Sequence, residues 1–329
     1  MILVINDFST FLGKKGDRFV IKKENKREEF STNNVEQIII AAVSSISYGA
    51  IRLAIKHSID VVFLSRGGTP LGRIYPCKLG GTTLTRKKQL EAYYSTVGTN
   101  IVKNLVKAKI MNQAYFLKSL EKTRKDINFT SEINSIVNIA KKIPGLTGLI
   151  DDIRGTLLGY EGIAANKYFS SLSNILPFKG RDRTSNDYVN IVLNYGYGVL
   201  YTEAEKACIL AGLDPYFGFL HKDRYNKPSM VLDLVEIFRP IIVDRAVVTL
   251  FSQKQINSKC FEKETYGDVF LSKEGREKIL SALLSRLNQQ IRFKGKKTSF
   301  KNIILGESRS IAQYVLGNIP EYEPFVYRW

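Results

Sequence analysis

Residues 89–122 read QLEAYYSTVGTNIVKNLVKAKIMNQAYFLKSLEK. Apolar side chains recur in this stretch at intervals of three and four residues, among them Ile101, Leu105, Ala108 and Met111. That spacing matches the 3.6-residue turn of an α-helix and predicts a long amphipathic helix. The residues before it follow a shorter period, so the chain is predicted to change there from a β-rich part to a helical part.

The N-terminal part, up to about residue 80, is predicted to consist mainly of strands. Short runs rich in β-branched side chains recur in it: ILVIN, RFVIKK, EQIIIAA, IDVVFLS and GTPLGRIYP. One helix, YGAIRLAIKHS, interrupts them, and Ser47 can cap it. The glycine and threonine cluster GGTTLTRKK, residues 80–88, predicts a linker. We therefore expect an α+β protein with a small β-rich domain over residues 1–84 and a larger α-helical domain over residues 85–329.

The helical period continues beyond the long helix. Further helices are predicted over residues 131–143, 149–173, 185–212, 231–240 and 272–293. The last nine residues, EYEPFVYRW, are aromatic and contain a proline. They predict a C-terminal tail that docks on the helical domain.

Composition narrows the functional class. The 329 residues carry 49 Lys and Arg against 31 Asp and Glu, a net charge of +18, so polyanions are the expected partners, with nucleic acid ahead of membranes. A hydrophobic content of 44% excludes a largely disordered chain. The three cysteines form no CxxC pair, and no apolar run reaches the ~18 residues of a membrane span, which predicts a reduced, cytoplasmic protein.

One of the two histidines opens the run HKDRYNKPSMVLDLVEIFRP, residues 221–240. Asp233 and Glu236 follow His221 in it and stand three residues apart, nearly one helical turn, so they are expected to share a helix face. If the intervening loop folds back, imidazole and carboxylates can converge on one cation. The alternative, of about equal weight from this run alone, is a solvated helix end with an incidental histidine.

A second acidic position lies in RGTLLGYEGIAANKYF, residues 154–169. Arg154, Glu161 and Tyr168 fall roughly along one helical stripe. Gly162 and Ala165 leave room for another helix or a nucleic acid backbone beside the Glu161 carboxylate. Without other evidence, a glutamate at such a helix position is more often solvated than part of a functional site.

Two basic groups could contact phosphates. Arg181 and Arg183 precede a helix that Ser185 can cap, an arrangement that suits phosphate binding. An ion pair of either arginine with Asp187 is an equally weighted alternative. Downstream, RFKGKKTSFKN forms a glycine-containing basic loop that could neutralise several phosphates or simply be solvated; its cations are Arg292, Lys294, Lys296, Lys297 and Lys301.

Taken in order, EGIAANKYF, RDRTSNDYVNIVLNYGYGVLY and HKDRYNKPSMVLDLVEIFRP follow a β-rich part that ends in RIYPCKL and RKKQL. This ordered set resembles the CRISPR-associated adaptation nuclease family over essentially the whole chain. Members of that family are metal-dependent DNA endonucleases and integrases that insert new spacers into CRISPR arrays. Many of them carry a glycine-containing loop after the histidine, whereas this chain has DRYNKPSM, so the shape of that loop departs from the family pattern.

The resemblance implies a catalytic metal site. Its ligands would be Glu161, His221 and Glu236, and Asp233 matches a family acidic position close to the metal. Carboxylate oxygens with one imidazole suit Mg²⁺ or Mn²⁺. Asp233 could hold a second metal, orient a water, or accept a hydrogen bond from His221, and the last role is the one we favour.

The resemblance also implies partners. The DNA contacts would come from Arg154, Tyr168, Arg181, Arg183, Lys294, Lys296 and Lys297, mostly to the backbone of double-stranded or branched DNA, so binding should depend strongly on salt. The β-rich domain would build a homodimer, and a small second CRISPR-associated protein would bridge two dimers. Two rivals stay open: a structure-selective nuclease that acts on branched DNA in repair, and a non-catalytic basic scaffold that binds nucleic acid by charge.

Overall fold

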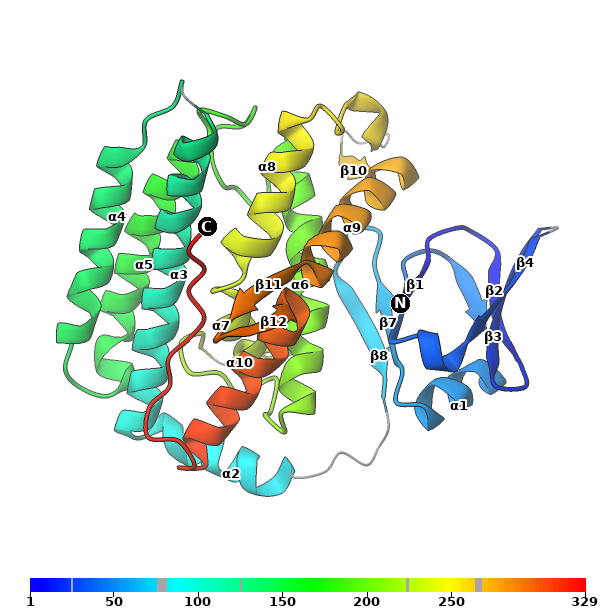
Figure 1. The fold of residues 1–329 in the computed structure, drawn as a ribbon, viewed down its shortest axis with the longest axis horizontal. Coiled ribbons are helices and arrows are strands. Elements are labelled where there is room, and N and C mark those ends of the chain that lie inside the picture. Colours follow the sequence, from blue (N-terminus) through cyan, green and yellow to red (C-terminus); the bar gives the residue numbers. More distant parts are fainter. Residues whose placement is uncertain (25, 76–81, 125, 223–224, 264–267) are drawn as a thin grey trace.

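A computed structural model describes residues 1–24, 26–75, 82–124, 126–222, 225–263 and 268–329 (Figure 1). Strands dominate the N-terminal quarter of the chain and helices most of the rest, which confirms the expected α+β class. Residues 76–79 of the RIYPCKL motif and residues 80–81 of the expected linker lie outside the described residues. Helix α2 begins at Thr82, so most of the expected linker is helical.

The β-rich part consists of two four-stranded sheets. The first has the order β1 (Ile2–Ile5), β5 (Gln37–Ile40), β7 (Asp60–Leu64), β8 (Pro70–Ile74), and its first three strands run parallel. The second has the order β4 (Lys26–Ser31), β3 (Arg18–Lys23), β2 (Thr10–Lys15), β6 (Ser44–Ile46). Helix α1 (Tyr48–Lys56) connects β6 to β7, and the Ser47 hydroxyl accepts a hydrogen bond from the Ala50 amide at 3.1 Å, which confirms the expected cap.

The helical part is built around α3 (Thr96–Thr123). The single helix expected over residues 89–122 is divided, because α2 ends at Tyr93 and Ser95 caps the start of α3. The other helices are α2 (Thr82–Tyr93), α4 (Thr130–Lys142), α5 (Ile150–Leu172), α6 (Tyr188–Leu210), α7 (Ser229–Val235), α8 (Arg245–Ser252), α9 (Lys273–Asn288) and α10 (Phe300–Val315). The helix expected over residues 231–240 ends early, because α7 stops at Val235 and a π-helical turn, η3 (Pro240–Asp244), follows. Pro240 has no amide hydrogen to continue an α-helix.

Two short hairpins accompany these helices, β9 (Phe261–Lys263) with β10 (Val269–Leu271) and β11 (Gln290–Phe293) with β12 (Lys296–Ser299). The second hairpin replaces the basic loop expected from the sequence and also the last turn of the helix expected over residues 272–293, because α9 ends at Asn288. Its turn consists of Lys294 and Gly295, both in the left-handed region at φ +47° and +77°. Glycine adopts that conformation readily, which closes the turn between the strands.

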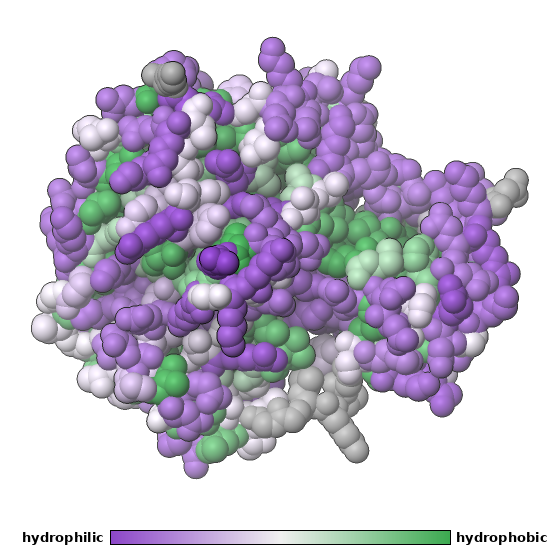
Figure 2. Space-filling view, viewed as in Figure 1, coloured by the Kyte–Doolittle hydropathy of each residue, from purple (hydrophilic) through white to green (hydrophobic). Residues whose placement is uncertain are grey.

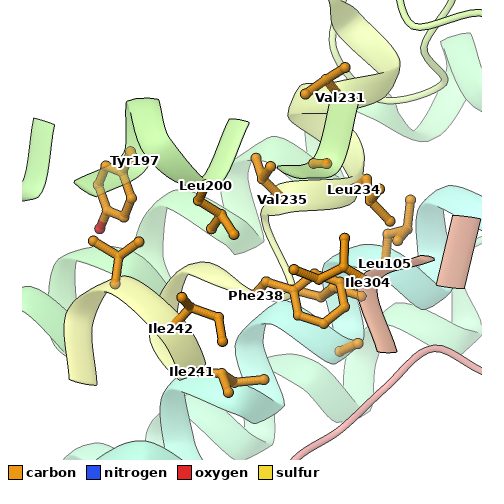
Figure 3. Close-up of a cluster of buried hydrophobic side chains, with 14 of the residues drawn as sticks. Leu105, Tyr197, Leu200, Val231, Leu234, Val235, Phe238, Ile241, Ile242 and Ile304 are labelled. Atoms are coloured by element: carbon orange, nitrogen blue, oxygen red, sulfur yellow. The ribbon is translucent and has the colours of Figure 1, made fainter. Parts of the chain in front are cut away.

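The core of the helical part lies where α3, α6, α7 and α10 meet (Figure 3). Leu105, Leu200, Leu234, Phe238 and Ile304 are all buried there. The segment that carries Asp233 and Glu236 is therefore fixed by apolar packing on one side. Its polar residues face the site described below.

The C-terminal tail docks as the sequence predicts. Tyr322 and Phe325 are buried, and the tail runs along α3 (Figure 1). The Asn112 side-chain amide donates to the Phe325 carbonyl at 3.2 Å, and its oxygen accepts from the Tyr327 amide at 2.8 Å. These bonds fix the tail in register with α3.

The β-rich and helical parts approach each other closely at two glycines, and ion pairs such as Lys301 with Glu36 also join the parts. A Cβ placed on Gly198 of α6 would lie 2.1 Å from the carbonyl oxygen of Gly68, in the turn between β7 and β8. Gly68 itself has φ +83° and packs on the Tyr195 backbone. Most of the surface in Figure 2 is hydrophilic, with an apolar area where the two parts meet. Among the described residues, no helix is apolar over enough of its length to cross a bilayer.

Candidate active site

A cavity of about 690 Å³ opens between α3, α5, α6 and the segment that follows α7. It brings together residues from distant parts of the chain that the sequence singles out: Glu161, Arg181, Arg183, His221 and Glu236. Lys109, Tyr201, Arg239 and Asp244 also line it. In this cavity, Glu161 of α5 meets residues that follow α6 in the chain.

Asp233 fixes the backbone that carries His221. Its carboxylate is buried and accepts three backbone amides: those of Phe219 at 2.6 Å, Leu220 at 3.0 Å and His221 at 3.0 Å. The same carboxylate lies 2.7 Å from the His221 Nδ1. Because a carboxylate only accepts hydrogen bonds, Nδ1 carries the proton, and Nε2 of a neutral ring keeps its lone pair for a ligand.

Arg154 supports the same segment from the opposite side. Its guanidinium donates to the Leu220 carbonyl at 3.0 Å and to the Phe219 carbonyl at 3.2 Å. It also pairs with Asp151, and its side chain is buried. In this structure the donors of Arg154 are therefore engaged within the protein, mainly by the loop that precedes His221, and not directed to a surface where DNA could bind.

Glu161 and Glu236 meet at one ammonium group. Lys109 of α3, only 7% exposed, contacts the Glu161 Oε1 and the Glu236 Oε2. Arg239 contacts the Glu236 Oε1 and donates to the Tyr201 hydroxyl at 2.5 Å. Burial alone raises the pKa of Glu236, but the charges of Arg239 and Lys109 outweigh it and lower that pKa to about 2. Burial alone lowers the pKa of Lys109. The charges of Glu236 and Glu161 outweigh burial, so the pKa of Lys109 is raised overall.

Tyr168 belongs to the wall behind the cavity. It is 0% exposed, and its hydroxyl donates to Asp244 at 2.8 Å, while the Tyr197 hydroxyl donates to the other Asp244 oxygen at 2.7 Å. Burial raises the pKa of Asp244 to about 6 despite these two donors. Because Tyr168 reaches no surface, the expectation that it contacts DNA is not supported, and its hydrogen bond gives it a structural role.

Arg181 and Arg183 both line the cavity, and Arg181 is half-buried. Arg181 donates to the side-chain oxygens of Asn190 at 2.9 Å and Asn194 at 2.6 Å, and Arg183 is exposed. The salt bridges found among the described residues include none from Asp187 to either arginine. Asp187, rather than Ser185, caps α6 by accepting from the Asn190 amide at 2.9 Å.

The basic cluster lies on the β11–β12 hairpin. Arg292, Lys294, Lys296 and Lys297 are exposed, and none of them lines the cavity. Lys301 instead begins α10 and pairs with Glu36 of the β-rich part at 3.0 Å. The exposed cations of the hairpin are free to meet a phosphate backbone outside the cavity.

The donor set fits a hard divalent cation. Two carboxylates already converge on one positive charge, and the Glu236 Oε2 accepts no properly directed hydrogen bond although it is buried. His221 lines the same cavity with Nε2 available. In the described part of the chain, no three His, Cys, Asp or Glu side chains yet stand close enough to hold an ion, and the Lys109 ammonium stands between the two glutamates. Residues 223 and 224 of the loop after His221 lie outside the described residues.

Comparison with known proteins identifies the family of this chain. The sequence profile of a family described as CRISPR associated protein Cas1 matches residues 3–284. The chain belongs to the Cas1 family. The CRISPR-associated endonuclease Cas1 1 of Archaeoglobus fulgidus is 37% identical over 350 residues, and the alignment covers 100% of both chains. The expected resemblance is therefore confirmed, and with it the class of spacer-integration nucleases.

Solved structures share the Cas1 fold. A casposase bound to an integration product matches with a TM-score of 0.87 and 27% identity, covering 99% of this chain and 94% of that one. A chain of a Cas6-RT-Cas1--Cas2 complex matches with a TM-score of 0.80 and 20% identity, covering 100% of this chain and 36% of that one. The second likeness shows the fold alone.

Two residues of this Cas1-family site escape the sequence patterns. Lys109 lies in the apolar stretch of α3, beside Asn112 and Gln113, and all three are buried. A buried face that carries three polar residues in five positions is itself a signal of a polar site. Arg239 follows Glu236 by three residues, a spacing that places both on one side of a helical turn.

Proposed function

We propose that this Cas1-family protein is a divalent-metal-dependent DNA endonuclease and integrase that inserts spacers into CRISPR arrays. Glu161, His221 and Glu236 would be the ligands, with Mg²⁺ or Mn²⁺ as the metal. The observation that carries the proposal is that two carboxylates from separate helices meet at one positive charge, in the cavity that His221 also lines. Oxygen-rich ligation with one imidazole suits both cations.

The chain's own residues would prepare this site. Asp233 sets the tautomer of His221, so that the ring presents Nε2 as a ligand. Arg239 orients Glu236 and is itself held over the rings of Tyr197 and Tyr201, at 4.9 and 5.5 Å. When bound, the metal would polarise the scissile phosphate and lower the pKa of the attacking water or DNA 3′-hydroxyl. Hydrolysis and integration would then differ only in the nucleophile.

Cations outside the metal site would position the DNA. Arg181 and Arg183 line the cavity, where they would hold the phosphates that flank the reacting one. Lys294, Lys296 and Lys297 on the hairpin would extend the contact along the backbone. With a net charge of +18, this binding is expected to be independent of sequence and sensitive to salt.

The assembly is part of the proposal. We place a β-rich domain at residues 1–84, which would form a homodimer, and a catalytic domain at residues 85–329. A small second CRISPR-associated protein would bridge two such dimers, as the family resemblance implies. CRISPR arrays lie in prokaryotic genomes, so the protein would act in the cytoplasm.

The two histidines provide a matched test. His221→Ala should abolish Mn²⁺-dependent cleavage and joining of DNA but leave DNA binding intact, because the backbone cations remain. His57→Ala is the control, since His57 ends α1 far from the cavity. Full activity in the His221 variant would rule out the assigned site.

Two further measurements separate the rivals. Site-specific joining of a short duplex at a repeat boundary is expected of an integrase and not of a repair nuclease. A non-catalytic scaffold would bind DNA equally well with a chelator and would be unaffected by Glu161→Gln in every assay. Loss of joining in Glu161→Gln therefore speaks against the scaffold.

A further inference from the structure

The Lys109 ammonium occupies the position that joins the two glutamates. It contacts the Glu161 Oε1 from α5 and the Glu236 Oε2 from the end of α7, and its side chain is 7% exposed. A buried lysine is costly unless it is paired, and here it is paired twice. Without it, the buried Glu236 carboxylate and the partly buried Glu161 carboxylate would face each other, with Arg239 paired to Glu236 alone.

A metal held by both glutamates would compete with Lys109 for the Glu236 Oε2, because Arg239 already contacts the Glu236 Oε1. A metal that bridges the two carboxylates would also stand where the ammonium now stands, in contact with one oxygen of each. The two cations also repel each other strongly where water is scarce. Binding of the metal therefore requires the Lys109 side chain to leave its present partners.

The structure contains an acceptor for the displaced group. Gln113 lies four residues after Lys109, on the same face of α3, and both line the cavity. The Gln113 Oε1 is buried and has no hydrogen-bond partner. Because unpaired buried oxygens are rare, this acceptor points to a second position of a nearby donor.

We propose that Lys109 is an internal counter-ion that the catalytic metal displaces. Before the metal arrives, it holds Glu161 and Glu236 together. After displacement, the ammonium turns to the Gln113 side of the cavity, where it adds a positive charge for the DNA phosphate. This inference rests on the metal site of the proposed function.

Metal affinity in the absence of DNA tests the displacement. Lys109→Met removes the competing charge at nearly constant length, so Mn²⁺ should bind roughly tenfold more tightly to the variant than to the unsubstituted protein. Its melting temperature should be lower without Mn²⁺ and should rise further on adding it. Lys107→Met is the matched control, since Lys107 is an exposed lysine of the same helix and should change neither value.

Removing the Gln113 acceptor should change Mn²⁺ affinity in the opposite direction. Gln113→Leu removes the partner of the displaced ammonium, so Mn²⁺ binding should weaken while Lys109 is present. In the double variant with Lys109→Met, this loss should vanish, because no ammonium then needs the acceptor. If Lys109→Met does not fold, Lys109→Gln removes the same charge and keeps a hydrogen-bonding group.

The outcomes separate the two proposals. Calorimetry with Mn²⁺ alone as the ligand, on the intact protein, gives each affinity. Equal or weaker binding in both neutral Lys109 variants overturns the counter-ion, while loss of Mn²⁺ binding in Glu161→Gln and His221→Ala still supports the metal site. Failure of the unsubstituted protein to bind Mn²⁺ overturns both. Tighter binding in a neutral Lys109 variant, with Lys107→Met unchanged, supports the displacement.

Discussion

Replacing Asp233 by asparagine tests how the site holds its histidine. The carboxylate meets four nitrogen atoms: three backbone amides, of Phe219, Leu220 and His221, at 2.6 to 3.0 Å, and the His221 Nδ1 at 2.7 Å. An asparagine side chain has only one acceptor oxygen. Whichever way it is turned, two of the four nitrogens then face its amino group.

The expected loss follows from that count. A buried amide left without an acceptor costs about 1–3 kcal/mol. The imidazole can adapt by moving its proton from Nδ1 to Nε2. One or two groups then remain unpaired, so the free energy of unfolding should fall by about 2–4 kcal/mol. The adapted ring presents an N–H to the cavity in place of a lone pair, so Mn²⁺ affinity should fall by about 10- to 100-fold.

Urea unfolding and Mn²⁺ calorimetry of Asp233→Asn measure the two effects. Asp152→Asn is the control, because Asp152 is exposed and accepts a single backbone amide, that of Leu149 at 2.8 Å. An unchanged unfolding free energy together with unchanged Mn²⁺ affinity would refute the assigned role of Asp233. A loss of stability with normal metal binding would limit that role to the backbone.

Three other variants address separate parts of the molecule. Arg154→Met should lower the cleavage rate by roughly 10- to 100-fold and leave DNA affinity unchanged, since Arg154 holds the His221 segment; weaker DNA binding at normal activity would contradict this. Alanine at Lys294, Lys296 and Lys297 together should weaken binding to any duplex and reduce the salt slope of binding by about 0.9 per lost phosphate contact, measured by fluorescence anisotropy. Burial raises the pKa of Glu307 from 4.5 to about 7, so the folded protein keeps a proton that the unfolded chain loses, and stability falls as pH rises through this window. Glu307→Gln should flatten that fall in urea unfolding between pH 5 and 8; an unchanged pH dependence would contradict it.

The sequence was most informative where apolar side chains repeat. The long helix α3 and the strands β1, β5 and β7 carry strong apolar patterns and were found as expected. Strand β4 reads KREEFS and has mostly charged residues, because it is an edge strand with little buried surface. Such a strand gives no alternating pattern to recognise.

For the site, too, the sequence predicted some features and missed others. The resemblance placed Glu161, His221 and Glu236 together, and they do line one cavity. Periodicity also put Arg154 and Tyr168 on a stripe with Glu161, but it could not tell whether a neighbouring element covers that stripe. Both side chains are buried against other segments. Such contacts depend on which elements pack together. A repeat within one helix carries no information about that packing.

The contact between Gly198 and Gly68 ties catalysis to the placement of the β-rich part. Any larger residue at position 198 would force the β7–β8 turn away from α6, next to the Tyr197 ring that supports Arg239. In the homodimer we propose, the spacing of the two reaction centres is transmitted in part through this close contact. An alanine at position 198 would then alter the distance between paired cuts or joins on DNA before it altered the chemistry at either one.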